Sequence, residues 1–142
     1  MSEMIKSCGI VVVRLEDGEY KFLMLRAGKF WEAGPKGKPE PNETQFETAI
    51  RETQEETGLC EKDLNFHWDK INYTTESYKK NKKTVTYFIA HTNVTNITIP
   101  YNPEINKYEH DEWAWMTYNE ALQLSNERIQ KVLKWANELL TT

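Results

Sequence analysis

The chain has 142 residues, a length typical of one compact domain, and we expect a single domain over residues 1–142. Its formal net charge is −4, so its overall charge attracts neither nucleic acid nor an anionic membrane, and no stable nucleic-acid complex is expected. An anionic substrate must therefore be held by a few locally placed cations.

Two features predict the compartment. Cys8 and Cys60 are too few for a disulfide framework and are typical of free thiols in a reducing environment. The apolar run at residues 10–13 is interrupted by Arg14 and is far shorter than a signal-peptide core or a membrane-spanning helix. We therefore expect a soluble, cytoplasmic protein that does not interact with membranes.

The predicted elements begin with two strands, residues 9–15 and 21–26. Asp17 and Gly18 lie between them, and Asp-Gly supplies the backbone freedom that a tight hairpin turn needs. The first part of the chain is therefore a predicted β-hairpin.

A helix is predicted to begin near Thr44 and to end at Gly58. The Thr44 hydroxyl can cap its first turn while Glu47 reaches back in a capping box, and Gly58 suits the left-handed conformation that stops a helix. Its apolar face consists of Phe46, Ala49, Ile50 and Thr53. The acidic residues are expected to point away from that face, toward the loop at residues 31–38.

The second half contains two more predicted strands, residues 66–74 and 84–91, with the lysine-rich segment 79–83 as a solvated turn between them. A short strand at 113–116 and a helical start at 118–124 follow. The final predicted helix is amphipathic, has Ser125 as its expected N-cap, and carries apolar residues at helical spacing: Ile129, Val132, Leu133, Ala136 and Leu140.

The acidic residues of the first predicted helix stand unusually close together. Glu52, Glu55 and Glu56 are three or four positions apart, so their carboxylates crowd one surface, and each like-charge pair costs a few tenths of a kcal/mol. Glu43 and Glu47 extend the cluster, and the only cation from Glu43 to Gly58 is Arg51. A bound divalent cation would relieve this repulsion, whereas the simpler alternative is a solvated, glutamate-rich helix.

The full pattern favours the functional alternative. Residues 37–59, GKPEPNETQFETAIRETQEETGL, resemble the Nudix signature G-x5-E-x7-R-E-U-x-E-E-x-G-U, in which U is apolar. Every invariant position is filled, and the one departure is Thr53, where the family usually has an aliphatic residue. The resemblance implies an α+β Nudix fold, an α/β/α sandwich with a mixed central sheet, and it implies pyrophosphohydrolase activity.

The resemblance also implies a metal site. Glu52 and Glu56 would be direct ligands, Glu55 a ligand or helper, and a backbone carbonyl near Gly37 would complete the set. Oxygen donors without histidine suit Mg²⁺, for which Mn²⁺ can substitute, and make zinc improbable. A metal-bound water would then attack phosphorus.

The general base is expected either on the helix or near the carboxyl terminus. Glu55 is the helix candidate, grouped with Arg51 in the catalytic set. Residues 108–115 resemble the E-H-x-x-W-x-W segment of asymmetrical diadenosine tetraphosphate hydrolases, in which the glutamate, here Glu109, approaches the metal ions. A charged loop is the simpler alternative, Glu112 is a weaker substitute, and His110 is given no chemical role.

Several further residues resemble the same Nudix subfamily and imply a dinucleoside polyphosphate substrate. Lys36 and Lys83 would neutralise phosphates, Tyr87 would offer a hydroxyl and Tyr78 a stacking face, with Trp31 ahead of the signature. Each has a plain alternative as core packing, a solvated hairpin or a cover for the sheet. The subfamily's His-His-Trp-Thr-Pro-Pro-Lys-Gly loop is replaced here by residues 29–37, which lack both histidines and are one residue longer.

The predicted reaction is therefore Mg²⁺-dependent hydrolysis of diadenosine 5′,5′′′-P1,P4-tetraphosphate to ATP and AMP. A diphosphoinositol polyphosphate phosphohydrolase and an RNA 5′-end pyrophosphohydrolase remain alternatives, although the acidic chain offers only the lysine cluster at 79–83 for such substrates. A non-catalytic nucleotide-sensing module is the alternative from another class, and the intact signature counts against it.

Overall fold

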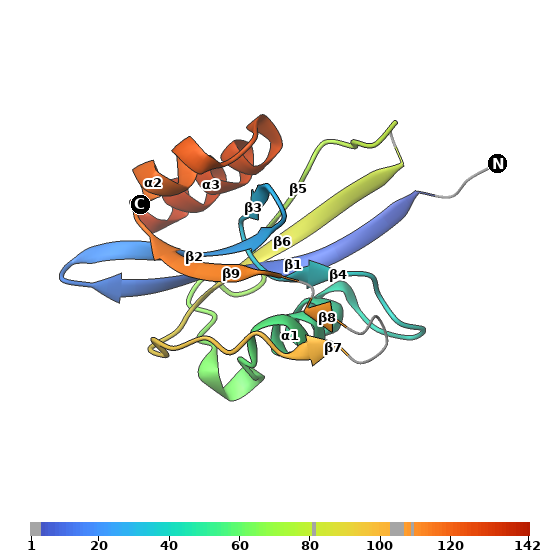
Figure 1. Ribbon diagram of the computed structural model, residues 1–142, viewed down its shortest axis with the longest axis horizontal. Coiled ribbons are helices and arrows are strands. Elements are labelled where there is room, and N and C mark those ends of the chain that lie inside the picture. The colour runs from blue at the N-terminus through green and yellow to red at the C-terminus, as the bar shows by residue number, and fades with distance from the viewer. Residues whose placement is uncertain (1–3, 81, 103–106, 109) are drawn as a thin grey trace.

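The computed structural model describes residues 4–80, 82–102, 107–108 and 110–142. Within them a mixed sheet is built from β1 (Ile5–Glu16), β2 (Glu19–Ala27), β3 (Phe30–Glu32), β4 (Lys36–Gly37), β5 (Asn72–Thr74), β6 (Lys83–His91) and β9 (Glu112–Met116). Helix α1 (Gln45–Thr57) covers one face, and α2 (Tyr118–Leu124) and α3 (Glu127–Leu140) cover the other (Figure 1). The predicted α/β/α sandwich with a mixed sheet is confirmed.

Strand β1 lies at the centre of the sheet, whose order is β3-β2-β1-β6-β5. It runs antiparallel to β2 and β4 and parallel to β6, with which it pairs over nine residues from Ile5 opposite Lys83 to Val13 opposite His91. Strand β9 pairs antiparallel with β2. The parallel pair makes the sheet mixed. The antiparallel pairing with β4 places the segment that leads to α1 beside the central strand.

Burial on both faces of the sheet explains the uninterrupted apolar run in β1. Val11 and Val13 belong to the core on the α3 side, whereas Ile10 and Val12 belong to the core on the α1 side. Successive side chains of a strand point to opposite faces, so a strand covered on both sides is apolar throughout. Ala49 joins the second core and anchors α1 to the sheet.

Local sequence determines both ends of α1 as predicted. Thr44 accepts a hydrogen bond from the Glu47 N–H at 3.1 Å while the Glu47 side chain accepts one from the Thr44 N–H at 2.9 Å. Gly58 ends the helix with φ 79°, in the left-handed region. Thr53 is fully buried and donates its hydroxyl to the Ala49 carbonyl at 2.7 Å, so this polar departure from the signature is satisfied within the helix.

Both predicted hairpins form with turns of positive φ. Asp17 and Gly18 connect β1 to β2 at φ 52° and 81°, and Lys79 and Lys80 lie between β5 and β6 at φ 54° and 60°. Two consecutive residues of positive φ match the right-handed twist of the flanking strands. Two short strands, β7 (Tyr101–Asn102) and β8 (Lys107–Tyr108), pair with each other in a separate two-stranded sheet (Figure 1).

Two predictions of local structure are wrong. The strand expected at residues 66–74 forms only at Asn72–Thr74, because turn hydrogen bonds replace strand pairing before it: the Asp69 N–H donates to the Phe66 carbonyl at 3.0 Å. A short 3₁₀ helix, η1 (Glu61–Asp63), also precedes this segment.

Ser125 is not the N-cap of α3. Its hydroxyl donates back to the Ala121 carbonyl at the end of α2, at 2.7 Å. Asn126 caps α3 instead, because its Oδ1 accepts a hydrogen bond from the Ile129 N–H at 2.9 Å. Among the described residues no helix is long and apolar enough to cross a membrane.

Candidate active site

Arg51 is the centre of the acidic side of α1. Its guanidinium donates to both oxygens of Glu43, at 2.7 and 3.1 Å, and to the Lys38 carbonyl at 2.8 Å. Its remaining nitrogen reaches Glu52 at 3.3 Å and Glu55 at 3.2 Å. One planar cation therefore holds three carboxylates of the signature and relieves part of the repulsion expected from their spacing.

The same contacts keep Glu43 and Arg51 ionised at neutral pH. The hydrogen bonds from Arg51 and from the Glu40 N–H lower the pKa of Glu43 to about 2. The hydrogen bond with Glu43, followed by that with Glu55, outweighs partial burial and raises the pKa of Arg51 above its usual range. The pair behaves as a fixed ionic support for the helix face.

Gly37 leaves the space that the Glu52 carboxylate occupies. A Cβ atom added at Gly37 would overlap the carboxylate carbon and both oxygens of Glu52. Gly37 itself is fixed because β4 pairs with β1, where it faces Cys8. The strand thus presents bare backbone to a carboxylate, as expected where a metal ion would take one carboxylate and one carbonyl oxygen.

Glu56 faces the sheet side rather than solvent. It is only 4% exposed, and its Oε1 lies 3.7 Å from Nδ1 of the buried His110. The other ring nitrogen of His110, Nε2, lies 3.3 Å from an oxygen of Glu32 in β3. His110 therefore lies between Glu56 of the signature and Glu32, which is 78 residues away from His110 in sequence.

Glu32 continues this chain of contacts to a lysine. Its second carboxylate oxygen is 3.5 Å from Lys36 Nζ in β4. Burial raises the pKa of Glu32, but the hydrogen bond from His110 and the charge of Lys36 together outweigh it and lower that pKa to about 2. Carboxylates of α1 and the cation of β4 are thus linked through Glu32 and His110.

Three of the predicted metal ligands lie on α1 and have different surroundings. Glu52 lies against Gly37, Glu56 lies against His110, and Glu55 is exposed beside Arg51. Glu109 lies outside the described residues. In the part of the chain that the structure describes, no three His, Cys, Asp or Glu side chains already form a group that could hold a metal ion.

A basic region near the β5–β6 hairpin consists of two predicted residues, Lys36 and Lys83, together with Arg128 of α3, and the charges of Lys36 and Arg128 both act on Lys83. Burial, and then the neighbouring charges of Lys36 and Lys79, lower the pKa of Lys83 to about 8. Its Nζ is 5.9 Å from the centroid of the Tyr78 ring, and the guanidinium carbon of Arg128 is 3.9 Å from the same centroid. Two cations therefore lie within cation–π distance of the Tyr78 ring.

Tyr87 and Trp31 are placed mainly by packing. The Tyr87 ring is fully buried in β6, and its hydroxyl has no hydrogen-bond partner among the described residues. Burial, and then the nearby charge of Glu32, raise the pKa of Tyr87 well above its usual value. Trp31 is half-buried and packs against the core on the α3 side. The Tyr87 hydroxyl could therefore serve a ligand as a hydrogen-bonding group.

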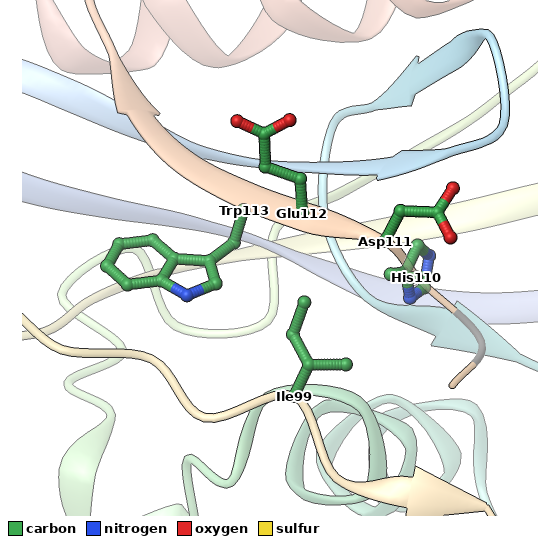
Figure 2. Close-up of a pocket in the computed structure, with 5 residues that line it drawn as sticks. All are labelled: Ile99, His110, Asp111, Glu112 and Trp113. Atoms are coloured by element: carbon green, nitrogen blue, oxygen red, sulfur yellow. The ribbon is translucent and has the colours of Figure 1, made fainter. Parts of the chain in front are cut away.

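Two cavities adjoin these groups. One, of about 470 Å³, is lined by His110, Ile99 and Trp113 together with Asp111 and Glu112. Figure 2 shows Ile99 and Trp113 facing this space while Glu112 points to the opposite side of β9. The other, of about 360 Å³, lies between the hairpin and α3 and includes Tyr78 and Arg128.

Sequence reasoning did not assign Glu32, His110 or Arg128 to the site. Glu32 lies in the segment that departs from the subfamily's loop, and His110 lies in the E-H-x-x-W-x-W segment. Both segments were therefore identified as parts of the site, but the sequence did not indicate that the two residues contact each other. Arg128 has no motif of its own. Its proximity to Tyr78 depends on how α3 docks beside the hairpin.

Comparison with known proteins is consistent with this geometry. Residues 6–136 match the Nudix domain family. The asymmetrical bis(5′-nucleosyl)-tetraphosphatase of Caenorhabditis elegans is 30% identical over 126 residues, covering 87% of this chain and 86% of the relative. The Rattus norvegicus protein of the same name is 31% identical, covering 96% and 95%.

A solved structure is similarly close. The chain superposes on a C. elegans Ap4A hydrolase binary complex with a TM-score of 0.84 and 28% identity, covering 97% of this chain and 98% of that chain. The signature, its helix-and-strand setting and these relatives agree. The chain belongs to the Nudix family of hydrolases.

Proposed function

We propose that this Nudix hydrolase cleaves diadenosine tetraphosphate asymmetrically to ATP and AMP. The observation that carries the proposal is the contact chain from Glu56 through His110 and Glu32 to Lys36, which places the acidic face of α1 beside the basic region. A substrate with one long polyphosphate chain can contact both the acidic face of α1, through a metal ion, and the basic region. The names of the C. elegans and rat relatives support the same reaction.

The donor set suits Mg²⁺, in line with the general use of divalent metal by Nudix hydrolases. Glu52, Glu56 and the Gly37 carbonyl would hold the ion, with Glu55 or Glu109 as a further ligand, and the fit of Glu52 against bare backbone at Gly37 supports this assignment. When bound, the ion would lower the pKa of a water and offset charge on phosphoryl oxygens. The same groups accept Mn²⁺.

We assign separate roles to the protein's own residues. Arg51 is a positioning residue, because it fixes Glu43, Glu52 and Glu55 without needing to reach the substrate. Glu55 has a 55% exposed side chain and can take a proton from water, a role for which Glu109 is the alternative. Each glutamate can be changed to glutamine and the pH–rate profile of the variant measured. Replacement of the true base should remove the acidic limb of that profile, whereas replacement of a positioning residue should only lower the rate at every pH.

The basic region would hold the remaining phosphates. Lys36 and Lys83 neutralise charge, Tyr78 offers a face for an adenine ring, and the Tyr87 hydroxyl can donate to a phosphate oxygen. The cavity of about 470 Å³ adjoins His110, and the cavity of about 360 Å³ adjoins Tyr78. Each has a volume suited to one nucleoside of the substrate.

The test is a comparison of kcat/KM on a panel of substrates with Mg²⁺, followed by chromatography of the products. We expect diadenosine tetraphosphate to be preferred over diphosphoinositol polyphosphate and 5′-triphosphate RNA, with ATP and AMP as products. Two ADP molecules, or preference for another member of the panel, would contradict the proposal. A folded protein that binds nucleotide and cleaves nothing would favour a sensing module.

A further inference from the structure

Arg128 occupies a position that no motif predicted. It is the second residue of α3, whose first turn lies beside the β5–β6 hairpin (Figure 1). Its guanidinium carbon is 3.9 Å from the centroid of the Tyr78 ring, and both residues line the cavity of about 360 Å³. The stacking holds the guanidinium in one orientation with its edge free to donate hydrogen bonds.

In the described part of the chain, one nitrogen of the guanidinium lacks an acceptor for its hydrogen bonds. Its Nη1 atom is shielded from solvent and has no hydrogen-bond partner among the described residues. Two carboxylates, Glu76 and Glu127, line the same cavity, but no carboxylate among the described residues forms an ion pair with Arg128. Glu76 pairs instead with Lys131, at 3.2 Å. A buried donor without an acceptor is costly, and more so when it is charged.

Other cationic and donor groups face the same region. Lys83 Nζ lies 5.9 Å from the centroid of the same Tyr78 ring, and the pKa of Lys83 is lowered by burial and then by neighbouring cations that include Lys36 and Arg128. The Tyr87 hydroxyl also lacks a partner among the described residues and senses the charge of Arg128. Two donors without hydrogen-bond partners within the described ranges, close to the charges of Lys83 and Arg128, are the complement of a ligand rich in anionic oxygens.

We propose that Arg128 is a further substrate-binding residue, which donates to the phosphates of the polyphosphate chain remote from the attacked phosphorus. This inference rests on the proposed function, because it names the part of that substrate which Arg128 holds. Lys36 lies beside the acidic face of α1, whereas Arg128 lies at the hairpin end of the basic region. The residue would thus favour long polyphosphate chains over short ones.

The direct test measures binding of inorganic tripolyphosphate by calorimetry without divalent metal. We expect Arg128→Gln to weaken binding by about tenfold, since it removes a charge-assisted pair of hydrogen bonds, and Arg128→Lys to recover part of the loss. Lys134→Gln, which removes one exposed charge from the same helix, is the matched control and should change the dissociation constant by less than about twofold.

Hydrolysis kinetics separate this inference from the proposed function. With diadenosine tetraphosphate, Arg128→Gln should raise KM by about tenfold and leave kcat nearly unchanged, because the contact is made equally in the ground and transition states. Arginine-dependent tripolyphosphate binding without tetraphosphate hydrolysis would refute the proposed function alone. Wild-type binding by Arg128→Gln with a lowered melting temperature would overturn the inference and leave the stacking on Tyr78 as purely structural.

Discussion

The fit between Gly37 and Glu52 gives the sharpest prediction about the acidic site. In Gly37→Ala the new methyl group would take the space of the Glu52 carboxylate. The backbone at Gly37 is outside the left-handed region, so alanine itself should be tolerated there, and the strand should still pair with β1. The strain therefore falls on Glu52.

The size of the effect follows from how far that carboxylate must move. It has to retreat by more than about 1 Å to reach ordinary contact distance, and a displacement of about 1 Å in a catalytic group can cost about 10²-fold in rate. That factor corresponds to about 2.7 kcal/mol of activation free energy. The free energy of unfolding should change little, because the carboxylate can rotate into solvent.

The assay is steady-state hydrolysis of diadenosine tetraphosphate with Mg²⁺, together with thermal unfolding. Gly18→Ala is the matched control, because its φ of 81° strains alanine while the space around it is open, so it should lose about 1 kcal/mol of stability and keep its kcat. A double variant with Glu52→Asp should lose less than the two single losses combined. Full activity of Gly37→Ala would refute the reasoning.

The further predictions concern three ionic groups, Arg51, Glu56 and Lys83. Arg51→Lys should lower kcat by about tenfold or more and reduce the melting temperature, because a lysine cannot bond Glu43 and the helix carboxylates together; unchanged kcat would contradict this. Glu56→Gln should lose several orders of magnitude in kcat while still binding nucleotide, and turnover at the wild-type rate would rule out its role at the metal. Lys83 should lose its charge as pH rises through about 8, so KM should rise above that pH, and Lys83→Met should abolish the rise; a parallel rise in both proteins would assign it to another group. Because the pKa of Lys83 is lowered from 10.5, its own contribution to the free energy of unfolding should increase with pH between about 8 and 10.5.

Local chemistry explains why the helix of the signature could be predicted well. The Thr44 capping box and the Gly58 stop involve residues only a few positions apart, so the sequence contains the whole interaction. The Asp17-Gly18 turn was predictable for the same reason. The N-cap of α3 was missed by one residue, because Ser125 and Asn126 are both good caps and the choice depends on the end of α2.

Long-range pairing explains what could not be predicted. The parallel pairing of β1 with β6 joins segments far apart in the chain, and no local pattern specifies it. The contact of His110 with Glu32 likewise requires β9 and β3 to lie on either side of β2. Periodicity could suggest that Tyr87 packs in the core, but only the register of β6 shows its ring fully buried.

The arrangement of Arg51 illustrates the same limit within a well-predicted helix. Helical spacing predicted that the carboxylates of Glu52, Glu55 and Glu56 crowd one surface. The bidentate contact with Glu43 and the hydrogen bond to the Lys38 carbonyl depend on the course of the preceding loop. The sequence therefore identified the members of the acidic cluster, and the fold determined which of them Arg51 holds.

Hydrolysis of diadenosine tetraphosphate in ¹⁸O-labelled water tests the central claim most directly. Purified protein with Mg²⁺ is incubated with the substrate, and the products are separated and analysed by mass spectrometry. Water attack at the phosphorus that becomes the phosphate of AMP, with ATP as the leaving group, predicts ATP without label and AMP with one labelled oxygen. Label in ATP would place the attack on the neighbouring phosphorus, and labelled ADP would show symmetrical cleavage, so either result would contradict the proposed position of the substrate.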